Sequence, residues 1–346
     1  MTHAPGPPGG GRAGARSRSH RRRPKPRWWK RPAVVSAAVL ATIGLVTLAV
    51  VNRSPSASDR AGDTADAKAP TTTAATTTAS SPPATTTPPA PTTSATPTTP
   101  APKSSAEAKS ELSSAIKSLS SKSKGRLSVA VTELDGDAGV SYEDGSSTYD
   151  TASIVKVDIL ASLLLRHQKA GTRLTSTERS EATVMIQRSD NTAATALWHA
   201  IGGKPGLDSA NRTFGLKHTA GGSGDLWGLT QTTTADQLTL LRVVFGDSSP
   251  LSAASRDYMH DLMSTVTKGQ QWGVSAADED DTGFALKNGW LQRSGTGLWD
   301  INSIGQVEYG GHTLLVSVLS SGNRSEQSGI DKVEDAAEAA AKALLS

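Results

Sequence analysis

Residues 151–170 read TASIVKVDILASLLLRHQKA. This stretch predicts an apolar helix from residue 153 to residue 170, which Gly171 ends. Ser153 and Lys156 are three positions apart, so on a helix the amine can lie beside the hydroxyl. A serine hydroxyl is a weak nucleophile until a neighbouring base takes its proton. The stretch therefore predicts a nucleophile with its base at a helix start, although a capping serine beside a solvated lysine is an equally simple interpretation at this point.

The rest of the periodic pattern predicts strands towards both ends of the C-terminal part and helices between them. Predicted helices cover residues 107–119, 153–170, 176–188, 193–201, 234–245, 255–263 and 325–345. Predicted strands cover residues 126–134, a segment after the turn at 135–139, and residues 284–291, 299–309 and 313–320. Because these strands do not alternate one for one with helices, we expect an α+β fold. It would be an antiparallel sheet flanked by its N- and C-terminal helices, with a helical subdomain inserted.

Two further polar motifs follow the first. RSDNT at residues 188–192 lies at the junction of two predicted helices, and LKNGW at residues 286–290 lies on a predicted strand. Taken singly, the first is a good helix start and the second is a hairpin strand with an exposed lysine. A glycine within the strand also suits a close approach of two backbones. The three motifs together, in this order, favour one shared site.

S-x-x-K, S-D-N and a K-x-G triplet in this order resemble the motifs of the class A β-lactamases and penicillin-binding proteins. The surrounding sequences TASIVKVDIL and MIQRSDNTAA agree with that resemblance, as does the threonine run at residues 232–234 before a helix. The resemblance covers residues 107–345. It implies a β-lactamase/transpeptidase-like fold and a serine hydrolase.

The resemblance also implies a role for each motif residue. Ser153 would be the acylated nucleophile, Lys156 its base or proton shuttle, and Ser189 the relay to the leaving nitrogen. Asp190 would be a buried structural hydrogen-bonder. The substrate-binding groups would be Asn191 for an amide side chain, Lys287 for the carboxylate, and the Asn288 and Gly289 positions of the same triplet. The N–H of Trp290 would form the oxyanion hole with that of Ser153. Apart from the resemblance, Arg293 could assist Lys287 with a carboxylate, although a surface arginine after a strand is the common alternative.

Three features depart from the family's pattern. Asn288 stands where a threonine or serine is usual, and only 32 residues separate Lys156 from Ser189, fewer than is typical. The family's glutamate on the loop after S-D-N, which activates the deacylating water, has no counterpart before Thr232. Asp225 is the candidate replacement for that glutamate as the deacylation base. We therefore expect acylation to be faster than release.

The N-terminal third predicts export and membrane attachment. Residues 1–32 hold ten Lys/Arg and no acid, which indicates a disordered basic cytoplasmic arm. Residues 33–51 carry no charge and would form a helix of about 28 Å, enough for a transmembrane signal-anchor with a cytoplasmic N-terminus. Residues 52–104 are a Thr/Pro/Ala-rich disordered linker, and residues 105–346 form the class A β-lactamase-like domain. A signal peptide cut near residues 56–58 remains the alternative to an anchor.

Composition excludes several function classes. The chain has 36 Lys/Arg against 32 Asp/Glu, and the excess of positive charge comes from the arm, so we expect no nucleic-acid binding. Without cysteine there is neither a disulfide nor a thiolate metal site, and the seven histidines show no ligand spacing. We expect no metal or cofactor.

Three functions are consistent with the sequence. The first is a membrane-anchored, single-pass serine hydrolase with an extracytoplasmic catalytic domain, a monomer that acylates itself with β-lactams or related amides. The second is a penicillin-binding enzyme that acts on cell-wall peptides. The third is a catalytically idle protein that binds β-lactams or wall fragments.

Overall fold

The computed structural model of the chain describes residues 103–122, 125–145, 148–281 and 283–345. The predicted arm (1–32), anchor (33–51) and nearly all of the predicted linker (52–104) lie outside these described residues. Among the helices that the structure describes, none combines the length and hydropathy that crossing a bilayer requires.

The elements follow one another in this order: α1 (Ser105–Lys122), β1 (Arg126–Glu133), β2 (Gly139–Tyr142), β3 (Tyr149–Asp150), the 3₁₀ turn η1 (Ala152–Ile154), α2 (Val155–Ala170), α3 (Ser176–Gln187), α4 (Asn191–Ala200), α5 (Gly203–Phe214), η2 (Trp227–Leu229), β4 (Gln231–Thr232), α6 (Thr234–Phe245), α7 (Ala253–Ser264), η3 (Lys268–Gln270), η4 (Val274–Ala277), β5 (Ala285–Gln292), β6 (Trp299–Tyr309), β7 (His312–Asn323) and α8 (Glu326–Leu345).

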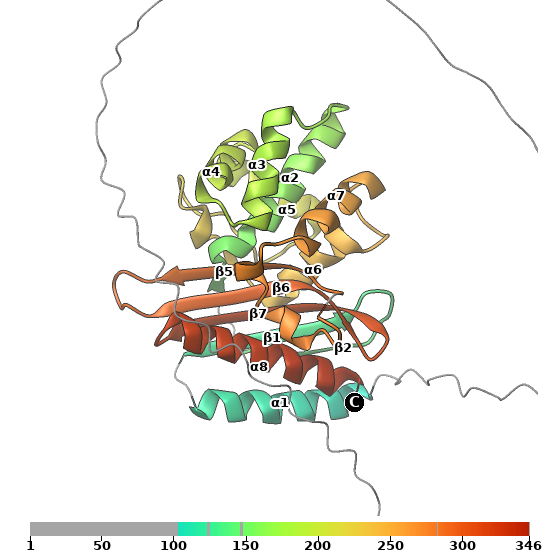
Figure 1. Cartoon of the computed structure of the whole chain (residues 1–346), viewed down its shortest axis with the longest axis vertical. Helices are drawn as coiled ribbons and strands as arrows, with labels where there is room; N and C mark the ends of the chain where they lie inside the picture. The colour runs from blue at the N-terminus through green and yellow to red at the C-terminus, as the bar shows by residue number, and fades with distance from the viewer. Residues whose placement is uncertain (1–102, 123–124, 146–147, 282, 346) are drawn as a thin grey trace, which may run out of the picture. The chain divides into compact units, whose positions relative to one another are not determined.

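A five-stranded antiparallel sheet forms the middle layer. Its strand order is β2-β1-β7-β6-β5, which brings the first strand of the folded part beside the last one. Helices α1 and α8 lie together on one face, and α2 to α5 lie on the other side (Figure 1). The expected α+β architecture, with an antiparallel sheet between terminal helices and a helical region, is confirmed. Strand β5 is an edge strand, so its outer edge is open to other parts of the chain.

Apolar side chains fill both faces of the sheet. Six consecutive residues of β1 are buried, and so are seven of β7, because helices cover both faces of these central strands. On the α8 side, buried alanines such as Ala336 and Ala340 let the helix backbone lie close to the strands. Leu112 and Ile116 of α1 complete that cluster.

Helix α2 is the centre of the helical region. Every residue from Val155 to Leu165 is buried, as expected for a helix that other helices enclose on all sides. A charged residue in such a helix needs partners, and Asp158 accepts hydrogen bonds from Asn211 Nδ2 at 2.9 Å and from the Ser162 hydroxyl at 3.4 Å. Burial nonetheless raises the pKa of Asp158 to about 7. The helix therefore carries its polar groups inside, where they can be positioned tightly.

Two local features differ from the sequence-based expectation. The helix at residues 153–170 begins with the separate 3₁₀ turn η1, so Ser153 lies before the α-helix proper. Helix α5 was missed because Gly203, Pro205 and Gly206 suggest a loop. A proline is tolerated in the first turn of a helix, and the buried positions Leu207, Ala210, Asn211 and Phe214 have helical spacing.

Truncation of Leu163 to alanine should lower the free energy of unfolding by about 2–5 kcal/mol, because the side chain is fully buried in α2. The matched control is Arg166→Ala, an exposed position on the same helix, which should change it by less than about 0.5 kcal/mol. Urea unfolding followed by tryptophan fluorescence measures both. Equal effects of the two substitutions would contradict the described packing of α2.

Candidate active site

The turn η1 carries Ser153, whose exposed fraction is 9%. Contacts from two directions fix the chain that enters this turn. The backbone N–H of Thr151 donates to Thr230 O at 2.8 Å, and Asn302 Nδ2 of β6 donates to the carbonyls of Asp150 and Thr151 at 2.9 and 3.0 Å. Ala152 has φ +47°, an uncommon conformation for a residue other than glycine. This strain beside a polar residue is typical of a functional site.

Lys156 is fully buried on the first turn of α2. Its Nζ donates to Ser189 O at 2.7 Å and to Asn191 Oδ1 at 2.8 Å, and it lies 3.0 Å from Ser189 Oγ. No hydrogen bond joins it to Ser153 Oγ among the described residues, so the expected direct pairing of lysine and serine is absent in this state. Burial lowers the pKa of Lys156 to about 7, although the charge of Asp190 opposes the shift. An amine with such a pKa can accept a proton near neutral pH.

The S-D-N motif forms the junction between α3 and α4. Ser189 is buried and has φ +58°, the second strained residue of the site. Asp190 caps α4 by accepting from the N–H of Ala193 at 2.8 Å. The expectation that Asp190 is buried is wrong, because capping a helix start leaves it exposed. Asn191 is exposed at the start of α4, with its oxygen on Lys156.

Lys287 of β5 reaches the same serine. Its Nζ donates to Ser189 Oγ at 3.1 Å and to Asn288 O at 2.9 Å. Burial, and then the charge of Lys156, holds the pKa of Lys287 well below its usual value. The Ser189 hydroxyl therefore lies between two amines that come from different layers of the fold. Because it can accept from one amine and donate to the other, it can carry a proton.

Gly289 lies against η1, which we call the nucleophile turn after the role expected of Ser153. A Cβ there would be 2.7 Å from Thr151 O and 2.8 Å from the backbone nitrogen of Ser153, so only glycine fits. Backbone groups two residues apart in a strand point to the same side, and Asn288 O meets Lys287 Nζ. The N–H of Trp290 therefore points outward from the open edge of β5, in the same direction as Asn288 O, which accepts from Lys287 Nζ. The Trp290 ring packs edge-on against Trp272, with 6.1 Å between centroids.

Asn288 has partners other than those expected of a substrate-binding residue. Its side chain is fully buried, its Nδ2 donates to the carbonyls of Gln270 and Trp272 at 2.7 and 3.0 Å, and its Oδ1 accepts from Ser303 Oγ at 2.6 Å. Alternation along the strand turns it away from the face that holds Lys287. The amide fastens β5 to the chain before η4 and is not positioned for a carboxylate.

Asp225 also lies apart from the site residues. Its Oδ1 lies 2.6 Å from His199 Nε2 in the last turn of α4, and both side chains are more than half exposed. Asn191, which contacts Lys156, begins the same helix, so about 12 Å of helix separate it from His199. This contact gives Asp225 a surface partner, and its role as a deacylation base stays a prediction.

Trp227 of η2 is the residue of this loop that meets Lys156. Its ring centroid lies 5.0 Å from Lys156 Nζ, within cation–π range, and its Nε1 donates to Thr195 Oγ1 at 3.1 Å.

Sequence reasoning missed both Trp227 and Asn302. For Asn302 the usable signal was an asparagine beside Ile301 inside the predicted strand 299–309. For Trp227 the sequence held no signal, because only folding brings its loop onto α2.

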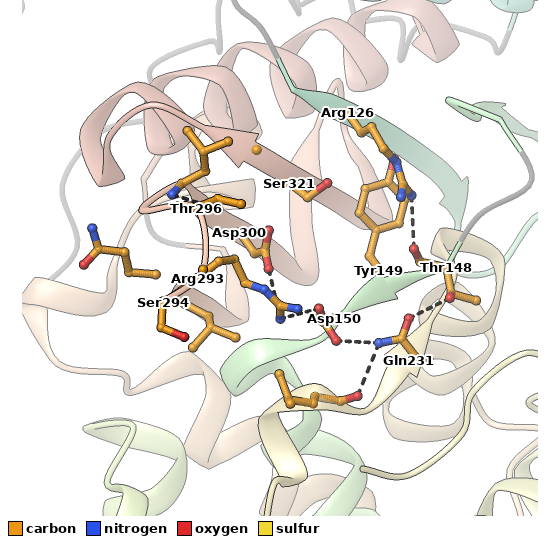
Figure 2. A pocket seen from close by; sticks show the side chains of 16 residues that line it. Arg126, Thr148, Tyr149, Asp150, Gln231, Arg293, Ser294, Thr296, Asp300 and Ser321 are labelled. Carbon is orange, nitrogen blue, oxygen red and sulfur yellow. Dashed lines mark hydrogen bonds and ion pairs between the residues drawn. The ribbon is translucent and has the colours of Figure 1, made fainter. Parts of the chain in front are cut away.

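A cavity of about 720 Å³ lies beside the strand that leads into the nucleophile turn (Figure 2). There Arg293 donates to Asp150 and pairs with Asp300 at 3.7 Å. Burial raises the pKa of Asp300 to about 6, although Arg293 favours its charged form. Because Arg293 follows β5 and is six positions from Lys287, about 20 Å of strand separate them. Of the two interpretations of Arg293, the structure favours a surface arginine after the strand, paired with Asp150 and Asp300. Within the described part of the chain, no three His, Asp or Glu side chains gather as a metal site.

This fold and this arrangement of a serine with two buried lysines define a class A β-lactamase-like protein. Residues 165–344, more than half of the chain, match the family described as the Beta-lactamase enzyme family, and the chain belongs to it. The matched range includes Ser189 and Lys287 and begins after Ser153 and Lys156.

Among curated proteins, the chain is similar to "Putative lipoprotein LppW" of Mycobacterium bovis and of Mycobacterium tuberculosis. Each is 29% identical over 173 residues, which cover 48% of this chain and 54% of the relative. The chain therefore spans about half the length of the curated relatives that it matches.

Solved structures agree on the fold. A class A β-lactamase from Bacteroides cellulosilyticus superposes with a TM-score of 0.60 at 14% identity, covering 68% of this chain and 98% of that one. A β-lactamase from Xanthomonas campestris gives 0.57 at 20% identity, covering 67% and 97%. The TLA-1 extended-spectrum β-lactamase gives 0.61 at 17%, covering 68% and 99%. At these identities the likeness shows the fold.

Gly289→Ala should lower the free energy of unfolding by about 1–3 kcal/mol, because the new Cβ would overlap the backbone of the nucleophile turn. The matched control is Gly295→Ala, where a Cβ has no neighbour within 4 Å. Chemical denaturation of both variants measures the difference. If Gly289→Ala were as stable as the control, β5 would not approach Ser153 as described.

Proposed function

We propose that this protein is an exported, membrane-anchored serine hydrolase that forms an acyl-enzyme at Ser153 with β-lactams or related amides. The observation that carries the proposal is the Ser189 hydroxyl, which has Lys156 Nζ at 3.0 Å and Lys287 Nζ at 3.1 Å. Two buried amines repel each other and are expensive to desolvate. Buried amines with lowered pKa values around one hydroxyl favour a site that transfers protons.

In the proposed acylation, Ser153 Oγ attacks the carbonyl carbon of the amide. Lys156 takes the hydroxyl proton, directly once the bound substrate has tightened the pair. As the tetrahedral intermediate collapses, the carbon–nitrogen bond breaks and the nitrogen receives a proton from Ser189, which Lys156 restores. An ester of Ser153 and a neutral amine remain.

The backbone groups around Ser153 would stabilise the oxyanion. The N–H of Ser153 lies at a turn that leads into α2, and the close approach of Gly289 to that turn supports a second donor from the N–H of Trp290 on β5. Donors fixed in this way need no reorganisation as charge develops on the oxygen.

Lys287 would bind the substrate carboxylate. Two of its three N–H donors have partners, Ser189 Oγ and Asn288 O, which leaves one for a ligand. A carboxylate beside Lys287 would favour its ammonium form and offset the burial that lowers its pKa. Asn191, exposed next to Lys156, would contact the amide side chain of the substrate.

Release of the acyl group is proposed to be slow. Hydrolysis needs a base for the attacking water, and the acid of the loop, Asp225, has a surface partner in His199.

A penicillin-binding enzyme that acts on cell-wall peptides shares the acylation step and remains the second candidate. The third candidate is an idle binding protein. In such a protein Ser153 would not pair with Lys156 even when a ligand is bound.

Attachment through residues 33–51 belongs to the same proposal. The similarity to proteins named as lipoproteins supports an exported, membrane-associated protein. The proposed topology is a single span with the catalytic part outside, acting as a monomer without nucleic acid.

Mixing the purified protein with a chromogenic cephalosporin and following intact mass separates the three candidates. Steady colour would indicate a working β-lactamase. A persistent mass adduct with little colour would indicate the slow release proposed here. Absence of both would favour the idle binding protein.

Ser153→Ala should abolish covalent labelling by a fluorescent penicillin, because no oxygen remains to form the ester. The matched control is Ser180→Ala, an exposed serine of α3 that should label as the natural chain does. Gel fluorescence measures both. Labelling that survives Ser153→Ala would refute the assigned nucleophile.

The labelling rate should rise with pH through about 7 and level off about one unit higher, because burial lowers the pKa of Lys156 to about 7 and only the neutral amine takes a proton. The charge of Asp190 opposes this shift, and the charge of Lys156 in turn lowers the pKa of the neighbouring Lys287. Lys156→Arg should slow labelling at least about 100-fold and remove this limb, since arginine stays protonated. A rate independent of pH between 5 and 9 in the natural chain would exclude Lys156 as the base.

A further inference from the structure

The segment 221–230 covers the nucleophile turn. Thr151 donates through its backbone N–H to Thr230 O at 2.8 Å and through its hydroxyl to Gly228 O at 3.4 Å. A Cβ on Gly228 would lie 3.8 Å from Ala152 Cα, which is ordinary contact distance. The segment is therefore packed on the chain that carries Ser153.

Contacts with α4 hold this segment in place. Trp198, which is buried, donates from Nε1 to Gly224 O at 2.9 Å. Within the segment, Gly222 N donates to Thr230 Oγ1 at 3.1 Å and Leu229 N donates to Leu226 O at 2.9 Å. These bonds fix the backbone on both sides of Trp227.

The half-buried indole of Trp227 is directed by its own hydrogen bond. Nε1 donates to Thr195 Oγ1 of α4 at 3.1 Å, and the ring lies with its centroid 5.0 Å from Lys156 Nζ. The polar edge of the indole thus points to α4, and the ring covers the amine. Because an indole has one donor and no acceptor, this ring cannot take a proton from water.

Hydrolysis of a Ser153 ester requires a water molecule at the carbonyl carbon and a group that removes its proton. The polar groups that bind Lys156 Nζ are Ser189 and Asn191, and no carboxylate of the described residues hydrogen-bonds to it. Trp227 covers a further side of the same amine. The side from which Lys156 could activate a water is therefore occupied by a ring.

We propose that Trp227 is a specificity-determining residue that prolongs the Ser153 acyl-enzyme by excluding the hydrolytic water from the Lys156 side of the site. The inference rests on the proposed function and gives its slow release a physical cause. In the blocked step, water oxygen would attack the ester carbon, the bond to Ser153 Oγ would break, and the water proton would pass through Lys156 to Ser153. A chain with this property retains a β-lactam or acyl-peptide covalently and turns it over poorly.

The experiment measures how long the acyl group stays attached. The full chain and its variants are labelled with a fluorescent penicillin, excess probe is removed, and loss of label is followed by gel fluorescence and intact mass. Trp227→Phe keeps a ring over the amine but loses the hydrogen bond to Thr195, so it should shorten the half-life about 3-fold, as loss of that bond from the Thr195 side does. Trp227→Ala should shorten it about 10-fold, and Trp227→Glu, which adds a base, about 100-fold.

Trp299→Ala is the matched control, because Trp299 is another half-buried tryptophan on the opposite side of the sheet region, at the start of β6. It should lose stability and leave the half-life unchanged. Thr195→Val removes the partner of the indole while the ring stays, and should shorten the half-life about 3-fold. This variant decides the matter if Trp227→Ala does not fold.

Each outcome has one meaning. An unlabelled natural chain refutes the proposed function itself. A labelled natural chain that releases the label within minutes, or half-lives unchanged in Thr195→Val and in folded Trp227→Ala, overturns the role of Trp227 and leaves the acylation proposal standing. Shortened half-lives in both variants, with Trp299→Ala unaffected, support the inference.

Discussion

Two buried lysine amines share one serine hydroxyl, and the surrounding structure serves to keep them together. Lys156 comes from α2, Lys287 from β5 and Ser189 from the junction of α3 with α4. Burial lowers the pKa of both amines, and the charge of Lys156 lowers that of Lys287 further. Such an arrangement persists only where packing on every side leaves the lysines no alternative position. The fully buried α2 and the central strands, covered on both faces, provide that packing.

The geometry around Ser153 depends on backbone contacts more than on side chains. Gly289 lets β5 touch the turn, and Asn302 fastens the preceding strand through two carbonyls. Strained φ angles at Ala152 and Ser189 show where the tightly packed layers impose a conformation that the residue itself disfavours. Strain in the turn that carries Ser153 and at Ser189 itself is consistent with a preorganised site.

The departures from the family's motifs have structural meanings that differ from one another. Asn288 has a structural role, because its side-chain amide is hydrogen-bonded to Gln270, Trp272 and Ser303. The absent loop glutamate coincides with a loop in which Asp225 turns to the surface and Trp227 covers Lys156. The asparagine at position 288 thus serves the packing of β5, whereas the missing glutamate alters the chemistry proposed for the site.

The sequence by itself determined the helices and strands with long periodic patterns, including residues 234–245 and 299–309, and the order of the three motifs. It did not determine helix α5, because local glycine and proline signals outweighed a real amphipathic pattern. Tertiary structure alone decided which polar groups meet: Lys156 pairs with Ser189 and Asn191, Arg293 with Asp150, and Trp227 lies on Lys156. The physical reason is that periodicity reports which face of an element is buried, whereas a contact between residues 33 to 143 positions apart depends on how the layers pack.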